Sequence, residues 1–146
     1  FQNAFDCITS FFTSFGYFFT HEENLRVAQQ ASHALKPNGR FFIDYLNPAA
    51  VRASLVPESR RSQQGYAIHE SRWIDEASNR VNKKTVVTRD GHPVARWEES
   101  VRLYTLEQMT ELLHAAHLNI TNAFGDYDGS PIGDHQPRMI LTGGKG

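Results

Sequence analysis

The sequence predicts an α/β fold that combines a mixed sheet with an inserted three-stranded antiparallel meander. Two segments that are apolar on both faces, Phe5 to Phe12 and Arg40 to Pro48, flank a segment with helical periodicity. This order is typical of a βαβ unit with a right-handed crossover. Alternation of period two follows over residues 66–104, and helical and apolar segments then resume. The core pattern therefore lies on both sides of the meander.

The helix between the first two strands has a clear start and a clear stop. Thr20 as N-cap, with Glu23 three residues later, has the pattern of a capping box. Residues 36–39, Lys-Pro-Asn-Gly, end the helix, because proline cannot continue it and Asn-Gly accepts a left-handed backbone. We therefore predict a helix of about four turns over residues 21–36.

The pattern changes after Pro48. Ala49 to Val56 is predicted to be a short helix, and residues 57–65 a polar loop without periodicity. Residues 66–104 contain three strand-like runs, and Asp90-Gly91 between the last two predicts a tight hairpin, because both central residues of that turn need positive φ. This segment is too long for a simple loop. We therefore predict one domain over residues 1–146 that carries an antiparallel subdomain at 66–104.

The last third of the chain returns to the core pattern. Thr105 and Gln108 predict a second capping box, followed by an amphipathic helix that ends near His117. Residues 119–124 and 138–142 are predicted to be the last two strands, separated by a loop rich in Asp, Gly and Pro. The core sheet should then have four strands, with an antiparallel last strand.

Composition limits the classes of function. A length of 146 residues with 40% hydrophobic and 21% charged residues suits one globular domain. A net charge of -1 gives no electrostatic reason to expect nucleic acid or an anionic membrane as partner. No apolar run reaches the roughly 20 residues that span a bilayer. Cys7 is the single cysteine, which suits a reducing compartment, so we expect a cytoplasmic location.

The order of the segments also carries a family resemblance. The motif F-D-x-I from Phe5, the aromatic turn TSFGYF of residues 13–18, a helix that ends in A-L-K-P-N-G, and then FFID resemble the second half of a class I S-adenosylmethionine-dependent methyltransferase. GDYDGSP followed by PRMIL resembles the last two strands of that Rossmann-like family more weakly. The family usually has L-K-P-G-G at the helix end. Asn38 here replaces the first glycine, and Asn tolerates positive φ.

The resemblance covers only part of the family pattern. No G-x-G-x-x-G segment occurs, and Gly143-Gly144 precedes no predicted helix, so neither provides a cofactor loop. We therefore expect a partial Rossmann-like sheet that belongs to a longer enzyme, and only weak S-adenosylmethionine binding by these residues alone. In such a partial sheet, Phe5 to Phe12 forms an open edge, for which we predict a homodimer.

The resemblance implies a site where the parallel strands end and the strand order reverses. Aromatic faces attract a cationic sulfonium, so three residues are expected at the methionine part of the cofactor: Ser10, Phe11 and Phe12. Five are expected to face a small-molecule methyl acceptor: Phe15, Gly16, Tyr17, Asp44 and Arg138. Asp44 is a possible general base. The aromatic residues can equally fill the core, and Arg138 can instead pair with Asp126 or Asp128, the pairing we favour.

Other functions stay open beside methyl transfer. The same framework suits a non-catalytic assembly or regulatory module. Half of a nicotinamide-dependent dehydrogenase is disfavoured, because its glycine fingerprint is missing too. His114 and His117 lack a third ligand, and the acidic loop of residues 126–135 does not match a calcium-binding pattern, so we expect no metal.

Overall fold

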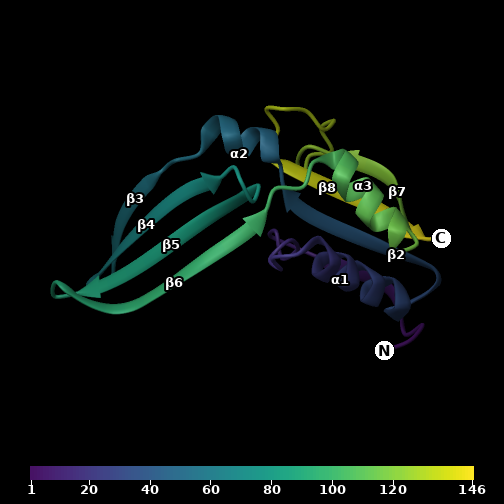
Figure 1. Ribbon diagram of the computed structural model, residues 1–146, viewed down its shortest axis with the longest axis horizontal. Helices are drawn as coiled ribbons and strands as arrows, with labels where there is room; N and C mark the ends of the chain where they lie inside the picture. The colour runs from purple at the N-terminus through teal and green to yellow at the C-terminus, as the bar shows by residue number, and fades with distance from the viewer.

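Two four-stranded sheets make up the β structure of the computed structural model, which describes all residues from 1 to 146 (Figure 1). The mixed sheet has the order β1–β2–β8–β7, and β1 is parallel to β2 while the other neighbours are antiparallel. Its strands are β1 (Phe5–Ser10), β2 (Leu35–Leu46), β8 (Arg138–Lys145) and β7 (Leu118–Phe124). The predicted α/β fold, with a mixed four-stranded sheet and an antiparallel insert, is confirmed.

The βαβ unit at the start of the chain has the predicted order, but β1 ends at Ser10 and not at Phe12, and β2 begins at Leu35 and not at Arg40. In α1 (His21–Ala34), the Thr20 hydroxyl accepts a hydrogen bond from the Glu23 amide at 3.2 Å, and the Glu23 carboxylate accepts one from the Thr20 amide at 3.0 Å. The helix ends two residues earlier than predicted, and β2 begins directly after it. Asn38 lies within β2 and adopts the expected left-handed conformation, with φ of 63°.

The antiparallel insert has one strand more than predicted. Residues 58–63, predicted to be loop, form β3 (Glu58–Gln63), which pairs with β4 along its whole length. The polar sequence of β3 shows no alternation, because this edge strand leaves nearly all its side chains exposed. The remaining strands of this sheet are β4 (Tyr66–Asp75), β5 (Arg80–Arg89) and β6 (His92–Arg102). The Asp90-Gly91 hairpin forms as predicted, with φ of 50° and 78°.

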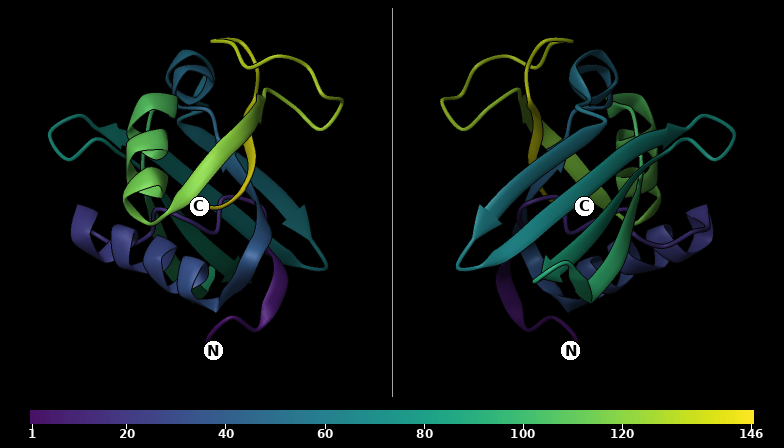
Figure 2. Two further views of the ribbon diagram at one scale, coloured as in Figure 1. Left: turned by 90° about the vertical axis from the view of Figure 1, so that its right-hand side faces the viewer. Right: turned by 90° about the vertical axis from the view of Figure 1, so that its left-hand side faces the viewer.

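Two helices cover one face of the mixed sheet (Figure 2). α1 and α3 (Leu106–Ala115) contact each other there, and α3 begins with the predicted capping box of Thr105 and Gln108. Alternate residues of β2 and β8 meet the apolar stripe of α3 in the core, which includes Phe41, Ile43, Tyr45, Met139, Leu141, Met109, Leu112 and Leu113. None of the three helices has the length and apolar character that a membrane span requires.

The antiparallel sheet extends beyond the carboxyl ends of β1 and β2 (Figure 1). The short helix α2 (Pro48–Ser54) leads from β2 towards it, and β6 leads back to the core. At this return point Val101 is buried, and the Tyr45 hydroxyl donates to the Arg102 carbonyl. The insert therefore lies at the edge of the mixed sheet where open α/β sheets bind their ligands.

Candidate functional site

A buried carboxylate organises the edge where β1 and β2 end. Asp44 of β2 is fully buried, with 0% exposure. It accepts hydrogen bonds from Nε of Arg138 at 2.6 Å, the Tyr127 hydroxyl at 2.6 Å and the Phe12 amide at 2.7 Å. The Arg138 guanidinium also donates to the Thr13 hydroxyl at 3.2 Å. Since a buried charge needs such partners, this network fixes the residues after β1 to the ends of β2 and β8.

The residues after β1 have a strained backbone. Phe12 and Thr13 have consecutive positive φ angles of 54° and 57°, a region that bulky and β-branched residues rarely occupy. The Thr13 amide donates to the Asp44 carbonyl at 3.0 Å, which adds a main-chain contact to the side-chain network. Strain that is held by surrounding contacts concentrates at functional sites, so this turn is a candidate for function on structural grounds.

The aromatic side chains of the turn divide between core and solvent. Phe15 is only 6% exposed and belongs to the core, with its ring centroid 6.2 Å from that of Tyr104. Phe11, Phe12 and Tyr17 are 42%, 83% and 43% exposed. The exposed rings therefore lie along the carboxyl edge of the sheet, where a ligand can reach them, whereas Phe15 fills the core.

Gly16 provides a close backbone approach inside the turn. Its φ is 89°, and a Cβ at this position would lie 3.2 Å from the Tyr45 hydroxyl and 3.3 Å from Cγ1 of Val101. Its carbonyl accepts a hydrogen bond from the Arg102 amide at 2.9 Å. Glycine is needed here because the backbone conformation and the available space both disfavour a side chain.

The structure brings most of the predicted site residues to one edge. Ser10 is the last residue of β1, opposite Ile43, and Phe11 and Phe12 follow it directly. Asp44 and Arg138, which we had considered separately, form one ion pair. Contact of Ser10, Phe11 and Phe12 with a cofactor stays a prediction, and so does contact of the five acceptor residues with substrate.

The predicted pairing of Arg138 with Asp126 or Asp128 is wrong, because Arg138 pairs with Asp44. Arg138 begins β8 beside the end of β2, so the buried carboxylate of Asp44 is within its reach. Asp126 and Asp128 instead accept hydrogen bonds from nearby amides of their own loop, those of Tyr127 at 2.7 Å and Ser130 at 2.8 Å. The local hydrogen bonding of these two aspartates matches their interpretation as turn residues.

Sequence reasoning missed several residues that build this edge. Thr13 and Tyr127 complete the Asp44 network, and the hydrogen bond to Asp44 raises the pKa of the Tyr127 phenol. Asn47 caps α2, since its side-chain oxygen accepts a hydrogen bond from the Ala49 amide at 3.1 Å. Asn followed by Pro is typical of a helix start and could have predicted this cap. Arg80, on β5, contacts the aromatic turn, and no local pattern pointed to it.

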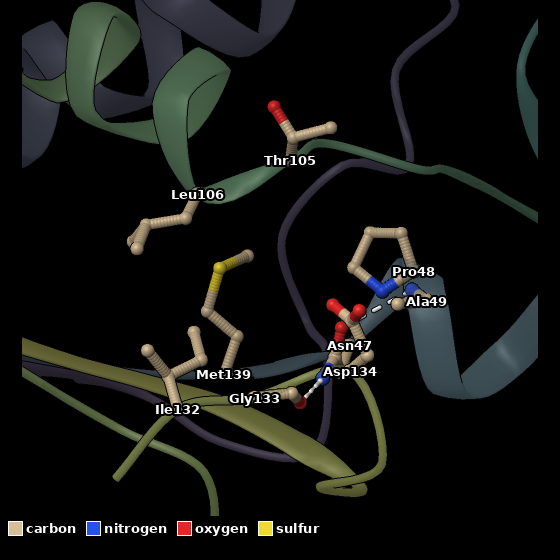
Figure 3. A pocket seen from close by; sticks show the side chains of 9 residues that line it. All are labelled: Asn47, Pro48, Ala49, Thr105, Leu106, Ile132, Gly133, Asp134 and Met139. Carbon is tan, nitrogen blue, oxygen red and sulfur yellow. Dashed lines mark hydrogen bonds between the residues drawn. The ribbon is translucent and has the colours of Figure 1, made fainter.

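A hollow of about 320 Å³ lies at the end of β2, on the side of the sheet that the helices cover (Figure 3). Its walls come from the starts of α2 and α3, from the loop before β8 and from β8 itself: Asn47, Pro48, Ala49, Thr105, Leu106, Ile132, Gly133, Asp134 and Met139. The side-chain amide of Asn47 donates to the carbonyls of Gly133 at 2.8 Å and Gln136 at 2.7 Å. Asn47 thereby ties the loop before β8 to the end of β2.

The fold matches solved structures of methyltransferases. An S-adenosylmethionine-dependent methyltransferase from Clostridium acetobutylicum matches with a TM-score of 0.83 and 19% identity, over 100% of this chain and 60% of that one. The CcbJ methyltransferase from Streptomyces caelestis matches with a TM-score of 0.82 and 15% identity, over 99% and 62%. CalS10, an amino pentose methyltransferase from Micromonospora echinaspora solved with S-adenosylmethionine bound, matches with a TM-score of 0.66 and 14% identity, over 98% and 59%.

These similarities define the class of fold. The chain has the fold of the class I S-adenosylmethionine-dependent methyltransferases, as the order of its segments predicted. It spans about 60% of the length of the solved structures named above. A comparison with descriptions of protein families gave no match. A comparison with curated proteins gave no match either.

Proposed function

We propose that this chain takes part in S-adenosylmethionine-dependent methyl transfer to a small molecule, as part of a longer enzyme. The observation that carries the proposal is that a fold shared with methyltransferases has a strained aromatic turn at its ligand-binding edge. The fold is shared with methyltransferases over 99% to 100% of the chain. A strained aromatic turn lies at the carboxyl ends of the parallel strands, where such sheets bind ligands.

The residues of this edge fit a sulfonium cofactor. The rings of Phe11 and Phe12 are exposed and adjacent, with centroids 6.1 Å apart, and aromatic faces attract cations. The Ser10 hydroxyl is proposed to contact the methionyl end of S-adenosylmethionine. When bound, S-adenosylmethionine supplies the methyl group. A loop for its adenosine is not among these residues, so we propose that another part of the enzyme provides it.

The chain itself contributes positioning and the exclusion of water. Methyl transfer is an in-line displacement, so its rate depends on the distance and orientation of the acceptor. We assign that task to the turn that includes Phe15, Gly16 and Tyr17. Asp44 and Arg138 hold this turn through Phe12 and Thr13. A role for Asp44 as general base stays a prediction. Its oxygens already accept hydrogen bonds from three donors, which argues against it.

A small molecule is the proposed acceptor class. Solved structures with this fold include, by their names, an amino pentose methyltransferase, a sugar N-methyltransferase and a 1,6-didemethyltoxoflavin N1-methyltransferase. These names describe those proteins, and we infer from them only the small-molecule class. The net charge of -1 adds no argument for a nucleic acid acceptor.

Tyr17→Ala tests the proposal in the full-length enzyme. The Tyr17 side chain is 43% exposed, so its removal should change stability by less than about 1 kcal/mol. Turnover should fall about tenfold or more if the ring orients the acceptor. Turnover is measured as S-adenosylhomocysteine formed with a panel of small amines and alcohols, and stability by thermal unfolding.

Phe41→Leu is the matched control. Phe41 lies in the core and outside the turn, so this variant should lose stability and keep its turnover. A melting loss in Tyr17→Ala with unchanged turnover would give Tyr17 a purely structural role. A native enzyme that forms no S-adenosylhomocysteine with any acceptor would favour the non-catalytic module instead.

A further inference from the structure

Arg80 connects the antiparallel sheet to the aromatic turn. It lies at the start of β5, and its side chain is almost fully buried, with 4% exposure. Its Nη1 donates to the Phe18 carbonyl at 2.9 Å, and its Nη2 to the carbonyls of Tyr17 at 3.0 Å and Gly16 at 3.4 Å. On the other side, the guanidinium donates to the hydroxyl and the carbonyl of Ser100, at 2.7 Å and 2.8 Å. One side chain thus bridges two parts of the fold.

No carboxylate balances this buried cation. None of the ion pairs in the structure includes Arg80, and burial, followed by the charge of Arg102, lowers the pKa of Arg80. The Phe19 ring makes a further favourable contact with this charge, since its centroid lies 4.8 Å from Cζ. A buried cation without a carboxylate is costly. The carbonyl oxygens of the turn, which accept hydrogen bonds from the guanidinium, offset part of that cost.

The turn is therefore held from two sides. The Asp44 network binds Phe12 and Thr13 at its start. Arg80 binds the carbonyls of residues 16–18 at its end. Between and beside these contacts, the rings of Phe12 and Tyr17 stay exposed. A turn anchored in this way presents its rings in one geometry, which is what a positioning element requires.

We propose that Arg80 is a positioning residue, which holds the aromatic turn at the carboxyl edge of the mixed sheet so that its exposed rings meet the ligand in a fixed orientation. It acts through the backbone of residues 16–18 and not by touching the reacting atoms. The antiparallel sheet is then a working part of the site. The effect on turnover rests on the function proposed above, whereas the effect on the turn does not.

Arginine is specifically suited to this role. Its planar guanidinium carries five N–H donors in a fixed fork, whereas the donors of lysine all project from one nitrogen. Arg80 uses that fork to reach carbonyls on two separate segments. Arg80→Lys keeps the charge and loses the fork, and Arg80→Met keeps only the aliphatic stem. Arg80→Met should therefore loosen the aromatic turn more than Arg80→Lys does.

Hydrogen exchange tests the assignment without any activity. The Arg102 amide, which donates to the Gly16 carbonyl at 2.9 Å, reports on the attachment of the turn to β6. Its exchange should accelerate by about tenfold or more in Arg80→Met and by a smaller factor in Arg80→Lys. Amides of β8, such as that of Leu141, should keep their native exchange rates.

The matched control is Arg72→Lys. Arg72 lies on the same antiparallel sheet and pairs with Glu70 at 2.6 Å, so its replacement should leave the Arg102 amide unchanged. Equal acceleration at Arg102 and Leu141 in both Arg80 variants would show a general loss of stability and overturn the proposal. Unchanged exchange at Arg102 in Arg80→Met would overturn it too.

Steady-state kinetics of the full-length enzyme complete the test. Arg80→Lys should lower kcat by about tenfold and leave the KM for S-adenosylmethionine within about twofold, because orientation is lost and not affinity. Faster exchange with an unchanged kcat would refute the positioning role. If the native enzyme transfers no methyl group, the proposed function fails, and the exchange experiment alone decides the contact.

Discussion

Asp44 and Phe12 illustrate how one charged group can hold a residue in a conformation that it disfavours. A left-handed backbone costs a residue with a side chain about 1–2 kcal/mol. A hydrogen bond to a charged group contributes about 1.5–3 kcal/mol. The bond from the Phe12 amide to the Asp44 carboxylate, at 2.7 Å, is therefore large enough to offset the strain at Phe12.

Phe12→Gly should separate stability from ligand binding. Glycine relieves the left-handed strain, about 1–2 kcal/mol, but loses about 0.5–1 kcal/mol to its greater freedom in the unfolded chain. Because Phe12 is 83% exposed, little packing is lost, and the free energy of unfolding should stay equal or rise by up to about 1.5 kcal/mol. Denaturant unfolding measures this change.

The affinity for S-adenosylmethionine should fall in the same variant of the full-length enzyme, because an exposed ring next to the predicted sulfonium position is lost. Titration calorimetry measures it. Gly65→Ala is a useful comparison, since Gly65 has φ of 81° and a Cβ there would meet no atom within 4 Å. It reports the opposing effects of left-handed strain and chain entropy without any packing contact. A clear loss of stability in Phe12→Gly would mean that the Phe12 ring packs against the protein.

Among the elements, β2 and the end of β6 are joined by Tyr45. Its side chain is fully buried, its hydroxyl donates to the Arg102 carbonyl, and it accepts a longer bond from the Tyr104 amide at 3.4 Å. Burial raises the pKa of Tyr45 far above its ordinary value of 10.0. The fold therefore holds the neutral phenol at the point where the antiparallel sheet rejoins the core.

We expect the stability contribution of Tyr45 to depend on pH above 10. At pH 7 the native protein should exceed Tyr45→Phe in unfolding free energy by about 1 kcal/mol, the value of one hydrogen bond. Above the ordinary phenol pKa of 10.0, the unfolded chain loses this proton and the folded chain keeps it. The native protein then loses about 1.4 kcal/mol per pH unit from this group, and the difference from Tyr45→Phe narrows.

Urea unfolding of both proteins at pH values from 7 to 11 measures that difference. The comparison removes the effect of other groups, such as lysines, which titrate in both proteins. A difference that stays constant up to pH 11 would mean that Tyr45 titrates in the folded protein as it does in the unfolded chain.

At the scale of the whole molecule, the open side of the mixed sheet stands out. β1 is an edge strand that pairs only with β2, and most of its residues are exposed. Phe5 and Phe11 are 39% and 42% exposed at its two ends. The helices pack on one face of the sheet and leave the face that carries Thr9 and Phe42 uncovered (Figure 2). Such an edge can accept another strand.

We therefore expect these 146 residues alone to form a homodimer, with an interface that includes residues 5–18 and possible exchange of strands or of the antiparallel insert. Sedimentation at micromolar concentration measures the mass. Thr9→Lys places a charge on the exposed edge and should shift the balance towards monomer. A clean monomer of the unaltered chain would mean that the edge is covered from within, and the dimer prediction would be wrong.

Local patterns predicted the helices and most strands correctly, because the causes of those elements are local. The capping boxes at Thr20 and Thr105 satisfy backbone amides within three residues, and Asp90-Gly91 adopts the conformation that its own backbone prefers. The strand β3 escaped prediction because its polar sequence has no periodicity. It exists through its pairing with β4, and pairing is not encoded in a local pattern.

The sequence by itself therefore determined the class of fold, the order of its elements apart from β3, and the edge at which a ligand is expected. Only the tertiary structure decided which side chains meet there. Arg138 and Asp44 are 94 positions apart, and Arg80 and Phe18 are 62 apart. The partner of a charged group depends on which strands become neighbours and which groups are buried together. Residue type and local spacing contain neither piece of information, so the Arg138 pairing was mistaken and Arg80 was missed.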